Sequence, residues 1–289
     1  MIITVIAILV MMPVYLIGTI GELISQKSGV YNIGIEGVMA IGAISAILSY
    51  NFVAANLWLS LAVGFLGGGL MGVLNSFLSI KLKLDQVVAG FGIWFFGIGV
   101  AGFIHTTFLS GRPPVKTFPK LLFSLDPVFY LSIVLWIVVW IIFSRTSTGL
   151  RIIAVGENPK AADVAGINVF RTRWLCVIVG CGLIGVAGAY LFMNFVQGFR
   201  TMVSGYGWMC FALVMFSRWK VSYTLLGAAI FTSINGIQAR LQAMGIIFIP
   251  LEFMNVLGYI AVIIGLVITM AFGGRGAMPS SLYIPYERE

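Results

Sequence analysis

The reactive side chains in this sequence are few and lie far apart. His105 is the only histidine, and Cys176, Cys181 and Cys210 each lie within an apolar stretch. The sequence has no set of residues for a Ser-His-Asp triad, no His-Glu-x-x-His zinc motif and no Gly-x-x-x-x-Gly-Lys-Ser/Thr nucleotide loop. We therefore expect no catalytic residues, no metal site and no cofactor bound by this chain.

Polar and aromatic residues within apolar stretches are better candidates for function. Asn32 and Glu36 lie in a segment interrupted by Gly29, Gly34 and Gly37, which predicts a broken helix where the chain enters the membrane. An ionisable residue at such a position indicates a solute pathway. Equally, Glu36 could accept hydrogen bonds from backbone groups that the glycines free. The full set of candidate pathway residues is Asn32, Glu36, Trp94, Trp208, Asn235 and Asn255.

These side-chain types suit one class of solute if they face a common cavity. Indole faces stack on a ring, and amide groups form hydrogen bonds to its edge, so the set favours a polar aromatic molecule. The alternative for each amide is a hydrogen bond between two helices, which is the commoner role of a polar residue in a membrane span.

The longest polar stretch, residues 145–173, carries seven of the 17 basic and 9 acidic residues. At its centre Asn158 suits an N-cap, Pro159 the first helical position and Gly166 the position after the last turn. A helix this short is not stable alone in water, so it must rest on other structure. Its small alanines would fit a groove on a partner protein. Alternatively, it lies on its own helix bundle.

Composition defines the elements that must position these residues. Of the 289 residues, 60% are apolar and only 9% are charged, and the mean hydropathy is +1.07. A soluble domain typically has about 25% charged residues, so a soluble enzyme and a disordered chain are both excluded. The apolar residues come in runs long enough for helices rather than barrel strands. We expect an all-α polytopic membrane protein that forms one domain over residues 1–289.

About nine transmembrane helices (8–10) are expected, and the seventh is short enough to be a broken or re-entrant element. If the N-terminus is outside, 12 of the 17 basic residues fall on the cytoplasmic side, with the C-terminus. The same topology places Trp174 and Trp219 at the inner interface. The predicted spans are 2–20, 34–50, 57–80, 86–109, 127–143, 174–197, 207–216, 222–238 and 251–272.

Small residues predict which helices pack centrally. Gly64, Gly68 and Gly72 recur every four residues in the third span, and the sixth span repeats this spacing with Cys181, Gly185 and Ala189. The fifth span has no glycine and consists mainly of large apolar residues, so we expect it to face lipid.

Three motifs resemble those of a known family. The first is Gly21-Glu22-Leu23 with Ser28-Gly29-Val30 and the 32–37 run; the second covers 149–151, 154–159, 161–162 and 165–167; the third is Gly205-Tyr206-Gly207-Trp208 with Ala212-Leu213 and Arg218-Trp219. They are similar, in order, to the motifs of ABC importer permeases of the nucleoside branch, within the branched-chain amino-acid and simple-sugar permease family.

The resemblance implies a permease in a bacterial inner or plasma membrane. It would form a heterodimer with a second permease, bind a cytoplasmic ATPase that holds ATP and Mg²⁺, and receive nucleoside from an extracytoplasmic substrate-binding lipoprotein. No nucleic-acid partner is implied. The residues expected to couple the permease to the ATPase are Gly156, Glu157, Asn158, Pro159, Ala161, Ala162 and Gly166. The competing hypothesis is a secondary transporter or channel without an ATPase; a membrane-embedded enzyme is disfavoured.

Overall fold

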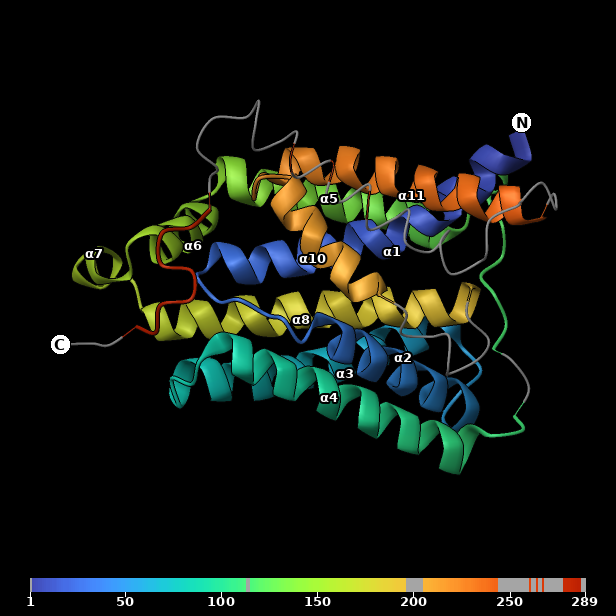
Figure 1. Cartoon of the computed structure of the whole chain (residues 1–289), viewed down its shortest axis with the longest axis horizontal. Helices are drawn as coiled ribbons and strands as arrows, with labels where there is room; N and C mark the ends of the chain where they lie inside the picture. The colour runs from blue at the N-terminus through green and yellow to red at the C-terminus, as the bar shows by residue number, and fades with distance from the viewer. Residues whose placement is uncertain are drawn as a thin grey trace.

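A computed structural model describes residues 2–112, 115–195, 205–243, 260, 264, 267 and 278–286. Within these residues every regular element is helical (Figure 1). Six helices are long and apolar enough to cross a membrane, and two shorter apolar helices accompany them. The all-helical membrane class is therefore confirmed. The predicted ninth span, 251–272, lies almost entirely outside the described residues.

The helices follow the predicted spans closely. Their bounds are α1 Ile2–Lys27, α2 Ile35–Phe52, α3 Leu57–Ser76, α4 Gln86–Ile104, α5 Pro127–Arg145, α6 Ser147–Glu157, α7 Pro159–Val164, α8 Val169–Asn194, α10 Tyr206–Phe216 and α11 Val221–Ala243. A turn of π-helix extends α3 over Phe77–Lys81, and another extends α4 over His105–Leu109. As expected, α10 is too short to cross a bilayer of about 30 Å alone.

Side-chain caps explain where several helices begin. The Asn56 side chain accepts hydrogen bonds from the first backbone N–H groups of α3, and Asp85 does the same for α4. Asp126 caps α5, Thr146 caps α6 and Asn168 caps α8. Each cap satisfies backbone donors that the first turn of a helix leaves unpaired. The starts of these helices are therefore fixed by local sequence.

The glycine ridges predicted in the third and sixth spans pack against each other as the α3–α8 seam. A Cβ added to Gly72 would lie 2.9 Å from the Cα of Ile178, and one added to Gly185 would lie 2.9 Å from the Cα of Gly68. Gly64 is in similarly close contact with Ala189. Backbones can approach this closely only where side chains are absent. The predicted central position of both helices is confirmed.

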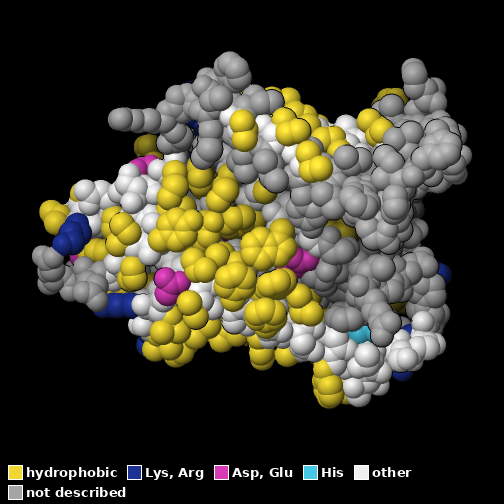
Figure 2. All heavy atoms as spheres, in the orientation of Figure 1, with side chains coloured by type: hydrophobic (Ala, Val, Ile, Leu, Met, Phe, Trp, Pro, Cys, Tyr) yellow, Lys and Arg dark blue, Asp and Glu magenta, His cyan; other side chains and the backbone are white. Residues whose placement is uncertain are grey.

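The surface of α5 differs from that seam. Leu131, Val134, Ile137, Val138 and Ile141 are exposed, and only Val128, Ser132 and Val139 are buried. Figure 2 shows a broad apolar region across the middle of the visible face, with Lys and Arg near both ends, including the end that carries α6 and α7. This distribution is that of a membrane protein with polar ends.

Candidate functional site

The predicted break between the first two helices is present. α1 continues to Lys27, and the chain then passes through a short non-helical segment before α2 begins at Ile35. Gly29 has a φ of +88°, which favours glycine. The polar residues of the break are buried rather than solvated, because Ser28 and Asn32 have no exposed surface. Non-helical backbone at this depth therefore lies inside the protein, as a membrane requires.

Asn32 belongs to a buried polar network that begins on α1. The Asn32 backbone N–H donates to Glu22 Oε1 at 3.3 Å, and Gln26 Nε2 donates to the same oxygen at 2.7 Å. Trp219 Nε1 donates to Gln26 Oε1 at 2.6 Å, while Gln86 Oε1 accepts from the Tyr31 backbone at 2.7 Å. The network connects the start of the break to α1, to α4 and to the segment after α10.

Sequence reasoning missed most of this network. Glu22 was not among the expected pathway residues, although it is fully buried and has the ionisable character that singled out Glu36. Trp219 was expected at the inner interface, which stays a prediction; the residue is 9% exposed and donates its N–H inside the protein. One feature of the sequence could have indicated this network: Glu22, Gln26 and Gln86 all lie at the edges of apolar runs.

Glu36 lies where α2 meets α10. Its Oε1 accepts a hydrogen bond of 2.6 Å from the backbone N–H of Gly205, the N-cap residue of α10. Gly205 has a φ of +91°, and Gly207 packs directly on the Glu36 backbone, with 2.7 Å between the Glu36 Cα and a Cβ placed at Gly207. The structural role considered for Glu36, acceptance of a freed backbone N–H, is therefore present.

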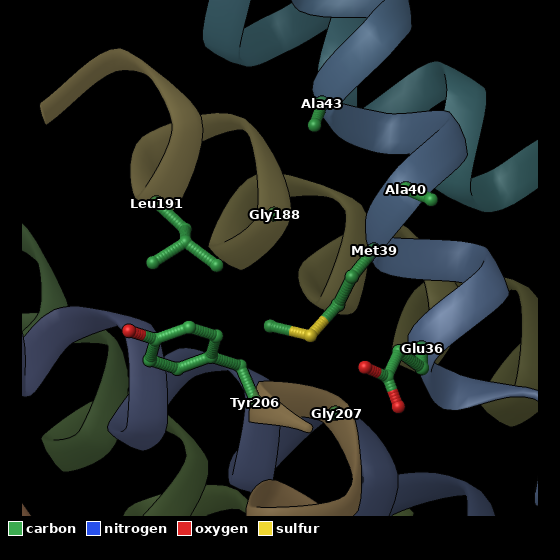
Figure 3. Close-up of a pocket in the computed structure, with 8 residues that line it drawn as sticks. All are labelled: Glu36, Met39, Ala40, Ala43, Gly188, Leu191, Tyr206 and Gly207. Carbon is green, nitrogen blue, oxygen red and sulfur yellow. The ribbon is translucent and has the colours of Figure 1, made fainter. Parts of the chain in front are cut away.

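Glu36 also lines a small cavity between α2, α8 and α10. The cavity has room for about one water molecule. Figure 3 shows the Met39 and Leu191 side chains pointing toward the ring of Tyr206, with the Glu36 carboxylate beside the start of α10. The remaining lining residues are small: Ala40, Ala43, Gly188 and Gly207. A solute larger than water therefore requires α2 and α10 to separate.

Trp94 and Trp208, predicted from different spans, are brought together. Their rings meet edge to face with centroids 5.5 Å apart. The ring centroid of Phe91 lies 6.5 Å from that of Trp208, and the ring centroid of Phe211 lies 6.2 Å from it. The Nε1 atom of Trp94 is buried and has no hydrogen-bond partner among the described residues. This aromatic cluster, Phe91, Trp94, Trp208 and Phe211, therefore has one unsatisfied donor beside several ring faces.

Asn235 makes the helix-to-helix contact that was the alternative to a pathway role. Its Nδ2 donates to the Tyr15 hydroxyl at 2.7 Å, which joins α11 to α1. Asn255, the sixth candidate, lies outside the described residues. Of the five described candidates, Glu36, Trp94 and Trp208 lie close together: a Cβ at Gly37 would lie 2.8 Å from the Cα of Trp94, and one at Gly207 lies 2.7 Å from the Cα of Glu36. Asn32 lies in the Glu22 network and Asn235 bridges helices.

The short helix predicted near 158–166 is confirmed. Asn158 Oδ1 accepts from the Ala161 backbone N–H at 3.0 Å, Pro159 is the first residue of α7, and Gly166 follows the helix with a φ of +83°. Exposed Ala161 faces away from the bundle, whereas Ala162 is 3% exposed and packs in a small cluster with Val155, Val169 and Tyr286.

The residues expected to contact a partner therefore have different roles. Gly156 is buried against the backbone carbonyl of Lys27, and Ala162 is buried in the cluster that attaches α7 to the protein. Neither can be reached by another chain without rearrangement, because its side-chain position is already occupied by the permease itself. Val164 has the opposite character: it is 91% exposed on α7 although it is apolar. Sequence reasoning missed Val164.

Residues 278–286 connect α7 to the break after α1. The Ser281 backbone N–H donates to the Gly156 carbonyl at 3.0 Å, and the Tyr286 hydroxyl donates to Asp163 at 2.9 Å. Glu157, another predicted coupling residue, accepts from the Ser280 hydroxyl at 2.8 Å. The segment thus binds both α6 and α7.

Arg173 joins the 278–286 segment to the break. Arg173 is 2% exposed, and its guanidinium donates to Ser281 Oγ at 3.0 Å, to the Ile284 carbonyl at 3.3 Å and to the Ser28 carbonyl at 3.1 Å. The Tyr31 ring is packed between Tyr283 at 4.4 Å and Phe211 at 4.8 Å. A continuous set of contacts therefore runs from α7 through residues 278–286 to the aromatic cluster.

These features together define a class of protein. Long apolar helices surround a buried break with polar residues, and a short helix at one end presents an exposed apolar side chain while remaining connected to that break. This is an architecture suited to a membrane permease. The chain belongs to the family described as branched-chain amino acid transport system / permease component, which it matches over residues 4–266.

Several curated relatives span most of the chain. It is 36% identical to the putative glucose ABC transporter permease protein TsgC13 of Haloferax volcanii, over 82% of this chain and 77% of that protein. It is 31% identical to the guanosine ABC transporter permease protein NupQ of Bacillus subtilis, over 92% and 91%. It is 29% identical to the nucleoside ABC transporter permease protein NupC of Lactococcus lactis, over 93% and 91%. No solved structure matches the chain significantly.

Proposed function

We propose that the chain is the permease subunit of an ATP-driven importer for nucleosides. Two relatives that align over more than nine-tenths of the chain are named for guanosine and nucleoside transport, which supports this substrate class. The aromatic cluster around Trp94 and Trp208 offers ring faces and an unsatisfied indole N–H, the groups that would stack on and bind a nucleobase. The relative named for glucose makes a sugar the second candidate.

The proposed assembly contains three kinds of partner. A second, non-identical permease completes the membrane unit, a cytoplasmic ATPase binds ATP and Mg²⁺, and an extracytoplasmic lipoprotein delivers the solute in a bacterial plasma membrane. All 289 residues act as one permease domain without a cofactor of their own. Matches to proteins named as ABC transporter permeases support the ATPase and the solute-binding partner.

The proposed topology has about nine spans, with the N-terminus outside and the C-terminus cytoplasmic. In its favour, α1 starts at the end of the molecule opposite α7, whereas residues 278–286 lie beside α6 and α7 (Figure 1). The basic residues Lys27, Arg145, Arg151 and Lys160 then share the cytoplasmic end.

The observation that carries the mechanism is the exposed outer face of α7. Val164 would insert into a groove of the ATPase, and Asn158, Pro159 and Gly166 would define the ends of the inserted helix. Gly156, Glu157 and Ala162 would hold the helix on the permease. Closure of the ATPase domains on ATP would move α7, and the contacts through Ser281 and Arg173 would transmit this movement to the break and to Glu36.

The test places a charge on that face. Val164→Asp should reduce ATP-dependent nucleoside uptake by at least about ten-fold, because burying an unpaired carboxylate in an apolar contact costs several kcal/mol. Val53→Asp is the matched control. Val53 follows the last turn of α2, is 74% exposed and lies outside the proposed contact. Uptake and substrate-stimulated ATP hydrolysis are measured in proteoliposomes that contain the assembled importer.

The outcomes separate the candidate functions. Equal uptake by Val164→Asp and the native chain would contradict a coupling role for α7. Uptake by the permease in vesicles without any ATPase would instead favour a secondary transporter or channel. A panel of guanosine, glucose and leucine as competitors then identifies the solute class: competition by glucose alone would overturn the nucleoside proposal.

A further inference from the structure

A groove beside α7 combines a cationic mouth with an apolar interior. The mouth has a volume of about 650 Å³ and lies between α6, the segment after α7 and the start of α8. Arg151 and Arg171 line it from facing elements, and both side chains are exposed. The polar residues beside them are Thr148, Asn168 and Thr172, and none of the described residues that line the groove is acidic.

The mouth continues into an apolar slot between α1, α5 and α8. Thr148, Ile152, Leu175 and Cys176 line both spaces, so the two are contiguous. The slot has a volume of about 200 Å³, and its other lining residues are all apolar: Ile24, Val139, Ile142, Phe143 and Val179. Leu175 is 53% exposed and Val179 is 41% exposed, which places the slot at the lateral, lipid-facing surface rather than in the core.

Both guanidinium groups are available to a ligand. Within the part of the chain that the structure describes, no salt bridge or side-chain hydrogen bond engages Arg151 or Arg171. The nearby carboxylates are already engaged, since Glu157 accepts from Ser280 and Asp163 accepts from Tyr286. The first turn of α8 adds a favourable field for an anion, because Asn168 is its N-cap and lines the mouth.

We propose that this groove binds an anionic phospholipid of the cytoplasmic leaflet. The assignment to that leaflet rests on the proposed topology. The phosphate lies between Arg151 and Arg171, whose planar guanidinium groups match phosphate oxygens. One acyl chain occupies the slot along Val139, Ile142 and Val179. Two features identify this occupant: the mouth is positively charged, and the apolar slot faces the lipid. Basic pockets between membrane helices at the cytoplasmic side recognise anionic headgroups.

A lipid bound in this groove would affect the structure around the coupling helix. It contacts α6 and the link 165–168 that follows α7, so it stabilises the base on which the coupling helix rests. The site is distinct from the proposed solute pathway, because none of its lining residues belongs to the Glu22 network or the aromatic cluster.

The experiment uses the full-length permease in phosphatidylcholine nanodiscs. Two photoreactive lipids are compared, a phosphatidylglycerol and a phosphatidylcholine that carry the same diazirine in one acyl chain, and labelled peptides are identified by mass spectrometry. The phosphatidylglycerol probe should label residues 139–143 and 175–179 more strongly. Arg151→Gln and Arg171→Gln should each reduce this labelling roughly five-fold, the effect of one basic residue near an anionic lipid.

Two further variants test headgroup binding and acyl-chain binding separately. Arg145→Gln removes a nearby exposed charge that does not line the groove, and labelling should stay unchanged. Val179→Trp fills the slot and should abolish labelling there while both arginines remain. Each variant is first checked for an unchanged thermal unfolding midpoint.

Three results would overturn the proposal. Equal labelling by both probes would indicate ordinary annular lipid. Loss of labelling in the presence of soluble glycerol 3-phosphate would indicate a site for a free phosphate ester. Loss of labelling when the second permease or the ATPase is added would indicate that a protein partner occupies this surface.

Discussion

The α3–α8 seam and the junction of α2 with α10 are both close contacts between helices, but they are built from different groups. In the seam, Gly64, Gly68 and Gly185 bring backbone against backbone with few polar side chains. At the junction, Glu36 accepts from the N-cap of a helix too short to span, and a small cavity remains beside it.

The difference indicates which part of the molecule is scaffold and which part rearranges. Tightly packed backbones have no space to move without losing contacts on both sides. The junction also has one close backbone contact, Gly207 on Glu36, but α10 is only 11 residues long and a cavity lined by the adaptable side chain of Met39 lies beside it, so the junction can open at lower cost. We infer that α3 and α8 stay together during transport while α10 moves relative to α2.

The largest effect is expected from a substitution in the seam. Gly185→Leu places a side chain where a Cβ alone would lie 2.9 Å from the Cα of Gly68, so the helices must separate. Overpacking of this kind costs about 1–3 kcal/mol or more, and we expect loss of monodisperse, folded protein. The measurement is the thermal unfolding midpoint in detergent, together with size-exclusion chromatography.

Gly92→Leu is the control for that substitution. Gly92 lies on α4, and a Cβ added there would have no described neighbouring atom within 4 Å, so the same change should leave the unfolding midpoint nearly unaltered. If the two variants unfolded at the same temperature, the seam would not be the rigid scaffold described above.

The seam is predictable from sequence, whereas the junction is predictable only in part. Small residues every four positions share one helix face, so the spacing around Gly68 and Gly185 indicates a close contact from the sequence alone. Helix ends are equally local, because caps such as Asn158 and Asp126 act on backbone groups within three residues.

Long-range partners cannot be predicted in the same way. Glu36 and Gly205 are 169 residues apart, and nothing in their local sequence states that they meet. Burial of Glu22 and Ala162 likewise depends on which helices surround them. Ala162 was expected to contact a partner because alanines are small, yet the same small size lets it pack against Val155 in its own chain.

A smaller effect is expected from Glu36 at the junction. Glu36→Gln keeps an oxygen that can accept from Gly205, so the unfolding midpoint should change little. Uptake should fall about ten-fold, equivalent to about 1.4 kcal/mol, because the pathway loses its ionisable carboxylate. Glu36→Ala should lower both the midpoint and uptake. Uptake by Glu36→Gln equal to that of the native chain would show that Glu36 has only the structural role.

The smallest effect concerns the indole N–H of Trp94. Trp94→Phe keeps an aromatic ring beside Trp208 but removes a buried donor that has no partner among the described residues. Stability should therefore fall only by the small packing loss of the shorter ring, since no hydrogen bond of the folded permease is lost. If the donor binds the solute, the apparent KM for uptake should rise about five-fold, the effect of one hydrogen bond of about 1 kcal/mol, with kcat unchanged. Trp140→Phe, on the exposed face of α5, should leave both constants unaltered. An unchanged KM for Trp94→Phe would remove Trp94 from the pathway and leave the junction near Glu36 as the place where the solute passes.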